Sequence, residues 1–170
     1  MAAPAEPESA REIVTTRLFD APRERVFAAW SSAAHLEKWW GPRGFTTTTH
    51  AFEFRVGGQW RLTMHGPDGT DYPNRLVYEE IVPFARIVYA HHGDGESVTF
   101  RTTVTFADED GATRVTMRAV FPTAAVRAEV IERYHADEGA EQNMDRMVEY
   151  VRGGLNDLPQ MKDRKDELLK

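Results

Sequence analysis

From residue 45 to residue 121 the hydrophobic pattern has a period of two in one segment after another, with no helix-length insertion. Trp60, Leu62 and Met64, for example, share one face of such a segment. This alternation is typical of strands with one buried face. Parallel neighbours would need long crossover connections, so the pattern predicts an antiparallel sheet. With one earlier strand included, we expect strands at about 12–19, 45–56, 60–64, 71–82, 85–92, 97–107 and 113–121.

Helical patterns flank this region on both sides. Two short helices are expected at about 20–30 and 33–40, and a Gly-Pro pair stops the second of them. One long helix is expected at about 123–152, with an apolar stripe that is interrupted at 135–143. The order predicts an α+β fold in which a curved antiparallel sheet of six to seven strands wraps round a long C-terminal helix, with two short helices after the first strand.

Length and composition are those of a globular domain. The chain has 170 residues, of which 41% are hydrophobic, enough for a substantial core. We expect one domain at residues 11–153, a disordered Ala/Pro/Glu-rich segment at 1–10, and a charged tail at 154–170 that is loose or docks on a partner. A homodimer held by this tail is one alternative.

Charge and residue usage exclude several classes of protein. The net charge is −6 and no Lys/Arg cluster is present, so a nucleic-acid partner is not expected. The absence of cysteine excludes disulfides and thiolate metal sites. No signal peptide or membrane-spanning run is recognisable, and a cytoplasmic location is expected.

Metal and nucleophile motifs are also missing. His91 and His92 are neighbours on a predicted strand, so their side chains leave opposite faces and cannot hold the same ion. Neither an HExxH motif nor a GxSxG elbow occurs, and the glycine pairs read as hairpin turns. We therefore predict neither a metal nor a cofactor.

Several motifs together resemble one known family: TRLFDAPRERVFAAW, HLEKWWGPRGF, FRVGGQWRLTMHGPDGTDYP, YEEIVPFARIVY and DEGAEQNMDRMVEYV. The resemblance, over about 15–151, is to the homologues of the activator of heat-shock protein 90 ATPase, in the START-like (SRPBCC) superfamily. It implies a helix-grip fold of the START/Bet v type with a deep hydrophobic cavity. Superfamily members include lipid carriers, hormone receptors, polyketide cyclases and co-chaperone domains, so the fold alone does not give the activity.

We interpret the chain as a domain that binds a small hydrophobic or amphipathic molecule between the sheet and the C-terminal helix. The residues expected to contact that ligand are Trp39, Trp40, His50, Phe52, Phe54, Trp60, Met64, Tyr78, His91, Phe100, Met117, Tyr134, Met144 and Met147. One alternative is an enzyme of polyketide cyclase, dehydratase or hydrolase type that uses His50, Glu80 or His91 with a tyrosine. Another is a module that interacts with a chaperone through an exposed apolar patch.

Two features leave a choice open. Adjacent helical residues point about 100° apart, so either Trp39 and Trp40 are both core at a helix end, or one of them lines the cavity mouth. Gly139 stands within the predicted long helix, where glycine costs about 1 kcal/mol relative to alanine. It either allows a close approach to another segment or opens space for the ligand.

Overall fold

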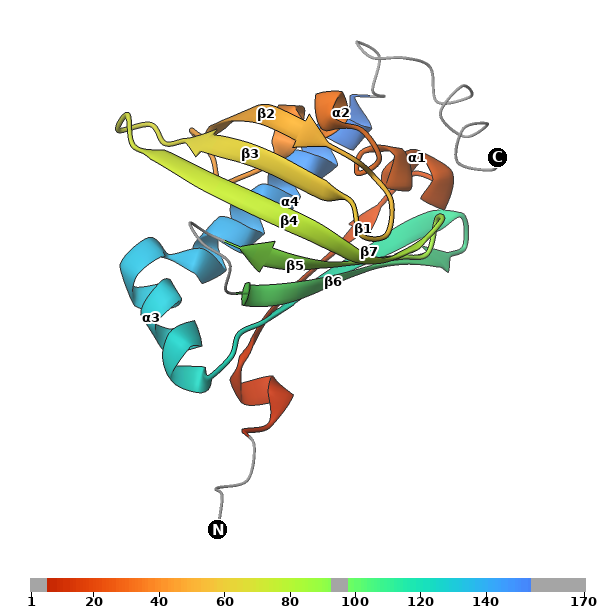
Figure 1. Ribbon diagram of the computed structural model, residues 1–170. Coiled ribbons are helices and arrows are strands. Elements are labelled where there is room, and N and C mark those ends of the chain that lie inside the picture. The colour runs from red at the N-terminus through yellow and green to blue at the C-terminus, as the bar shows by residue number, and fades with distance from the viewer. Residues whose placement is uncertain (1–5, 93–97, 154–170) are drawn as a thin grey trace.

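The computed structural model of the protein describes residues 6–92 and 98–153 and contains one antiparallel sheet (Figure 1). The strand order across the sheet is β1-β7-β6-β5-β4-β3-β2, so β2 to β7 form a meander and β1 joins at its end. The strands are β1 (Glu12–Phe19), β2 (Thr46–Phe52), β3 (Gln59–His65), β4 (Asp71–Val82), β5 (Arg86–His92), β6 (Val98–Glu109) and β7 (Ala112–Val120). The antiparallel sheet predicted from the alternation is confirmed.

The helices cover one face of this sheet, which we call the inner face (Figure 1). They are α1 (Arg23–Ala28), α2 (Ala33–Trp39), α3 (Ala124–Tyr134) and α4 (Ala136–Arg152), and a 3-10 turn, η1 (Glu8–Ala10), precedes β1 beyond the end of the sheet (Figure 1). Figure 1 shows α4 running across the sheet and α3 lying at one of its ends, and α4 contacts β1, α2 and α3. This is the α+β helix-grip architecture.

The sequence predicts one long helix at about 123–152. The structure has two helices there, α3 and α4, so the prediction of a continuous helix was wrong. His135 adopts the left-handed conformation, with φ 53° and ψ 44°, and its N–H caps α3 at Ile131 O and Val130 O. Histidine enters this region more readily than most residues that have a Cβ atom. The polar stretch that interrupts the apolar stripe therefore begins at a break in the backbone.

Part of the N-terminal segment is ordered next to the sheet. Glu8–Ala10 form a 3-10 turn inside the segment predicted to be disordered, and Arg11 donates from Nη1 to Phe121 O over 3.0 Å. Residues 1–5 and the predicted charged tail at 154–170 lie outside the described residues.

The tryptophan pair belongs to the core. Trp39 is fully buried, packs its ring 4.9 Å from that of Trp30, and donates from Nε1 to Ala29 O over 3.1 Å. Trp40 follows the helix as its C-cap with extended dihedral angles, φ −67° and ψ 135°. The 100° separation of helical neighbours thus does not apply to it, and its ring packs 4.9 Å from that of Trp60. Both tryptophans enter the same aromatic core.

A contact from α4 fixes the turn that follows α2, and we call it the turn clamp. Arg146 Nη1 donates to the carbonyl oxygens of Trp40, Gly41 and Pro42 over 2.9, 2.9 and 3.1 Å. Asn143 Oδ1 accepts from the Gly41 N–H over 3.0 Å. Burial lowers the pKa of the Arg146 guanidinium, and the nearby Arg43 lowers it further. One partly buried cation therefore holds all three carbonyls, of which Pro42 O also accepts from the Phe45 N–H over 3.2 Å.

Glycine is needed twice in this contact. Gly41 has φ +94°, and a Cβ atom there would lie 2.9 Å from Met64 Cε. On the facing helix, a Cβ atom at Gly139 would lie 3.3 Å from Pro42 Cγ. Of the two readings of Gly139, the close approach to another segment is the one that the structure supports.

Replacing Arg146 by Met should lower the free energy of unfolding by about 2–3 kcal/mol, because the carbonyls of Trp40 and Gly41 lose the guanidinium donor and Pro42 O keeps only the Phe45 N–H. Urea denaturation measures the change, with Arg152→Met, an exposed position on the same helix, as the matched control. If the two variants lost the same small amount, the turn clamp would contribute nothing to stability.

Candidate functional site

The inner face changes from closely packed to accessible along the strands. Residues directly opposite each other on neighbouring strands point to the same face, so the register defines rows across the sheet. One row joins Trp60, Leu76, His91 and Phe100. Trp60 and Leu76 are 0% and 1% exposed, whereas His91 and Phe100 are only partly buried. The accessible end of this row lies on β5 and β6.

A second row behaves in the same way. It joins Tyr78, Tyr89, Thr102 and Ala119 across β4, β5, β6 and β7. The first three are each 2% exposed, and Ala119 is partly accessible. Burial raises the pKa of both tyrosines, and the hydrogen bond between Tyr89 and Thr102 offsets part of that rise at Tyr89. Both tyrosines therefore stay protonated and offer neutral hydroxyl groups.

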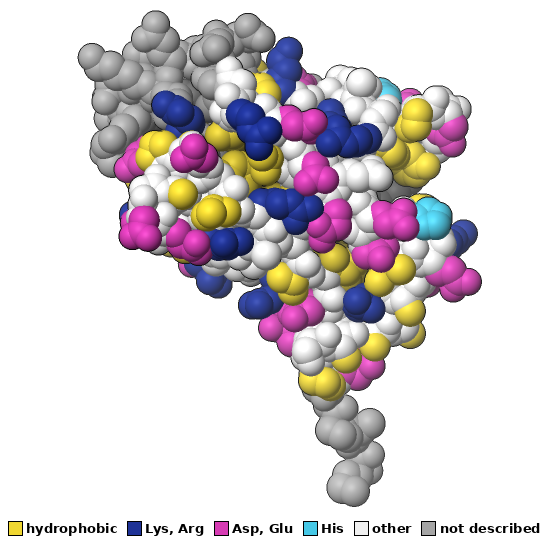
Figure 2. All heavy atoms as spheres, turned by 180° about the vertical axis from the view of Figure 1, so that it is seen from behind, with side chains coloured by type: hydrophobic (Ala, Val, Ile, Leu, Met, Phe, Trp, Pro, Cys, Tyr) yellow, Lys and Arg dark blue, Asp and Glu magenta, His cyan; other side chains and the backbone are white. Residues whose placement is uncertain are grey.

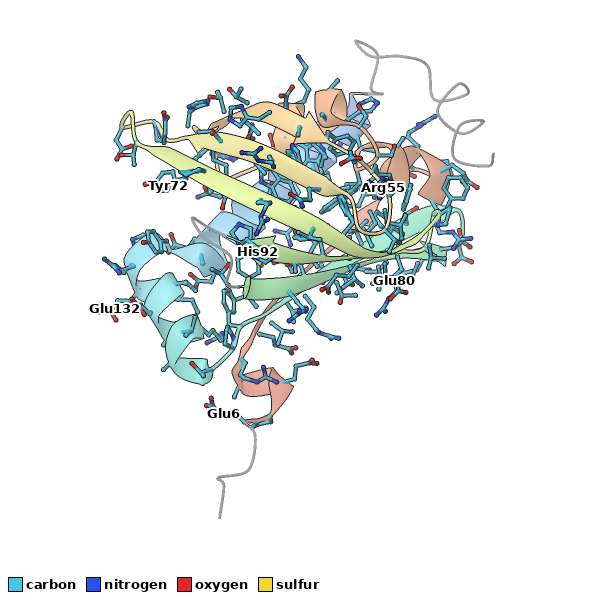
Figure 3. The ribbon with its side chains drawn as sticks, viewed as in Figure 1. Glu6, Arg55, Tyr72, Glu80, His92 and Glu132 are labelled. Carbon is cyan, nitrogen blue, oxygen red and sulfur yellow. The ribbon has the colours of Figure 1, made fainter. Side chains whose placement is uncertain are left out.

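The accessible end of the inner face is the end that α3 approaches. Figure 3 labels Tyr72 on β4, His92 on β5 and Glu132 on α3, and all three lie toward this end of the molecule. Glu80 and Arg55 mark the opposite end, near α1. The residues facing inward at the α3 end define the candidate binding region, and we call it the open end.

His91 is the central polar group of the open end. Its Nδ1 lies 2.8 Å from Thr99 Oγ1, and its ring stacks on Phe100 with centroids 4.4 Å apart and planes 14° apart. Phe100 in turn packs 5.0 Å from Phe121. Burial, and to a lesser extent His92, lower the pKa of His91 to about 4. The imidazole is therefore neutral near pH 7.

A separate groove of about 270 Å³ lies between β1 and the junction of α3 with α4. It is lined by Glu12, Ile13, Val14, Arg127, Asp137, Glu138 and Glu141. Figure 2, which views the molecule from behind, shows acidic and basic side chains interspersed on that side. Some of them are paired, as Arg17 is with Glu141 and Asp145. This groove is too polar to be the predicted apolar cavity.

The predicted contact residues fall into two main groups in the structure. One group belongs to the buried core or packs against it at the closed end: Trp39, Trp40, Phe52, Phe54, Trp60, Tyr78, Met144 and Met147. The other group faces inward and is partly accessible: Met64, His91, Phe100 and Met117. His91 and Phe100 pair with each other at the open end, whereas Met64 and Met117 lie on other rows of the inner face and pack against the core.

Two predicted residues lie elsewhere. A β-bulge between Thr49 and Ala51 breaks the alternation, so His50 is exposed and lies 2.8 Å from Thr63 Oγ1 through Nε2. The expectation that His50 shares the apolar face does not hold. Tyr134 ends α3 with 59% of its surface exposed, and the Arg133 guanidinium lies 5.8 Å from its ring centroid.

Tyr89 and Thr99 also belong to the site, although neither was among the predicted residues. The alternation of 85–92 places Ile87, Tyr89 and His91 on one face, so Tyr89 could have been found from the sequence. Thr99 is the extra residue where the pairing of β5 with β6 shifts register. No sequence signal marks that bulge.

Among residues 6–92 and 98–153, no three His, Cys, Asp or Glu side chains come together in a way that could hold a metal ion. Within the same residues, no helix has the length and hydrophobicity that crossing a membrane requires.

Comparison with known proteins gives a consistent result for the fold. The family model described as "Activator of Hsp90 ATPase homolog 1-like protein" matches residues 20–152. A search of curated proteins gives no significant match. A crystal structure of a Rhodobacter sphaeroides protein is 26% identical, with a TM-score of 0.72 over 91% of this chain and 99% of the other.

Two further solved structures agree. A Chromobacterium violaceum protein is 25% identical, with a TM-score of 0.72 over 83% of this chain and 96% of the other. An AHSA1-like protein from Aeromonas hydrophila is 20% identical, with a TM-score of 0.65 over 84% and 93% of the two chains. The last of these supports the fold alone.

Acid should destabilise the protein through His91. Because its pKa is about 4 in the folded chain and 6.5 ordinarily, the unfolded chain takes up the proton first, and stability is lost as the pH falls from about 6.5 to 4. We expect the wild type to lose about 1–3 kcal/mol more than His91→Phe over this range in urea denaturation. His50→Phe, which changes an exposed histidine, should behave as the wild type does. A His91 ring that titrates near pH 6.5 by NMR would contradict this prediction.

Proposed function

Since the chain belongs to the family of activator of Hsp90 ATPase homologue 1-like proteins, we propose that it binds a small hydrophobic or amphipathic molecule between the sheet and the C-terminal helices. One observation carries this proposal. Met64, His91, Phe100 and Met117 face inward and yet stay partly accessible. Side chains that point into a protein without being covered are typical of a binding region.

The composition of the open end suits such a ligand. Met64 and Met117, which face inward on other rows and pack against the core, supply flexible thioether side chains that adapt to irregular apolar shapes. Phe100 adds an aromatic wall, and burial of apolar ligand surface would contribute roughly 25 cal/mol per Å². His91 and the partly accessible Asn74 supply polar contacts that orient the ligand. The closed end, with its packed tryptophans, supplies a rigid base for this region.

An enzyme of cyclase, dehydratase or hydrolase type has less support. Of the three residues considered for it, Glu80 is ion-paired with Arg86 and His50 is exposed on the outer face, which leaves His91. The side-chain partner of His91 is the hydroxyl of Thr99, and among the described residues neither a carboxylate nor a tyrosine is hydrogen-bonded to it. A pKa of about 4 also makes the imidazole a weak general base.

A module that binds a chaperone also has less support. Large exposed apolar side chains occur on β1, on the β2–β3 connection, at the end of β4 and on α3: Val14, Leu18, Val56, Val82 and Tyr134. Val14 and Leu18 lie opposite Arg118 and Arg114 on β7, which interrupts any apolar patch there. The alternative of a homodimer depends on the tail at 154–170, which lies outside the described residues.

Filling the open end should abolish ligand binding. Ala119→Trp places an indole among the inward-facing side chains and should weaken binding of the neutral fluorescent probe N-phenyl-1-naphthylamine at least tenfold, because the ring occupies the space of the probe. Ala107→Trp, on the exposed outer face of β6, is the matched control and should bind as the wild type does. Fluorescence titration measures both.

The smaller change Ala119→Leu keeps this test usable if the tryptophan variant does not fold, and its loss of affinity should be lower. Native mass spectrometry of the wild type, with an organic extract of the same sample, would identify any co-purified ligand. Probe binding that is equal in Ala119→Trp and the wild type would refute a site at the open end.

A further inference from the structure

The hydrogen bonds of Thr99 determine which nitrogen of His91 carries the proton. A threonine hydroxyl has one proton to donate. Thr99 Oγ1 donates it to the carbonyl oxygen of His91 over 2.9 Å. The same oxygen lies 2.8 Å from His91 Nδ1, so it accepts the Nδ1–H. The neutral imidazole is therefore protonated on Nδ1, and Nε2 presents a lone pair.

The environment of the ring leaves that lone pair available. Stacking on Phe100 holds the imidazole plane, so the orientation of Nε2 is fixed as well. No described residue is hydrogen-bonded to Nε2, and the His91 side chain is partly accessible. Its neighbours in the row are Leu76 and Phe100, both apolar. His91 Nε2 is thus an oriented acceptor whose neighbours in the row are apolar.

The rows that contain His91 and Tyr89 are uncharged. Their described side chains are aliphatic, aromatic or neutral polar groups. On β1, the guanidinium of Arg17 is neutralised by two carboxylates of α4. A carboxylate or ammonium group that lay against these two rows would lose hydration and find no charged side chain in either row.

We propose that the open end selects an uncharged, largely apolar molecule that carries a hydroxyl group, and that this hydroxyl donates a hydrogen bond to His91 Nε2. The proposal rests on the function proposed above and adds the chemical class of the ligand. Thr99 is the positioning residue, because its hydroxyl holds the imidazole in the tautomer that accepts at Nε2.

Two probes that differ in one proton test the hydroxyl. 2-Naphthol donates a hydrogen bond, and 2-methoxynaphthalene keeps the oxygen but cannot donate. Both are titrated as competitors of N-phenyl-1-naphthylamine. In the wild type 2-naphthol should bind more tightly, and in His91→Phe, which keeps the aromatic stack, its advantage should shrink by roughly fivefold to tenfold.

Thr99 gives a second, independent readout. In the wild type, the ring nitrogen shifts of His91 in ¹H–¹⁵N NMR should show the proton on Nδ1. Thr99→Ser keeps the hydroxyl and should keep both this tautomer and the preference for 2-naphthol. Thr99→Val removes the hydroxyl and should shift the proton toward Nε2, with a loss of the preference.

The outcomes separate the two proposals. If N-phenyl-1-naphthylamine does not bind the folded wild type, the proposed function fails and this inference fails with it. If that probe binds but neither naphthalene competes, or the preference is equal in the wild type and His91→Phe, the hydroxyl proposal is overturned while the binding site stands. A wild-type imidazole with its proton on Nε2 would overturn it as well.

Discussion

One guanidinium nitrogen, Arg146 Nη1, ties the last helix to the turn that ends α2, and much of the molecule depends on that contact. By holding three consecutive carbonyls, it fixes the point where the chain leaves the helix and turns Trp40 toward the core. Trp40 then packs against Trp60 on β3, so the position of α4 and the packing of the inner face are set together. Salt would weaken such a contact little, because the cation is partly buried and its partners are dipoles rather than charges.

The two ends of the inner face differ in how closely their side chains are packed. Near α1 and α2, aromatic rings pack against one another and bury Trp30, Trp39 and Trp60 almost completely, and such packing makes this end rigid. Near α3, residues on the same rows of the same sheet are left partly uncovered. The same strands run from the closed end to the open end. The buried parts of β5 and β6 therefore fix the positions of His91 and Phe100.

The antiparallel sheet could be predicted from the sequence because its strands repeat the same alternation of apolar and polar residues, as Trp60, Leu62 and Met64 show. Prediction from the sequence failed where the backbone departs from regular geometry. Trp40 takes extended angles one residue after a helix, and His135 takes a left-handed conformation between two helices. One bulge turns His50 to the exposed face, and another leaves Thr99 outside the regular pairing of β5 with β6. These departures depend on contacts between distant segments, which local patterns do not contain. The candidate site was found only in part for the same reason, since Thr99 stands at a bulge.

The strand order has a consequence for how the molecule assembles. Strands β2 to β7 pair with their sequence neighbours, so they can form hairpin by hairpin at a low cost in loop-closure entropy. β1 pairs with β7, from the opposite end of the domain, and this contact closes the longest loop in the sheet. We expect β1 to dock late in folding. Because β1 contributes Ile13 and Thr15 to the inner face, that face would be completed only after β7 has been made, and a nascent chain would leave it open until then.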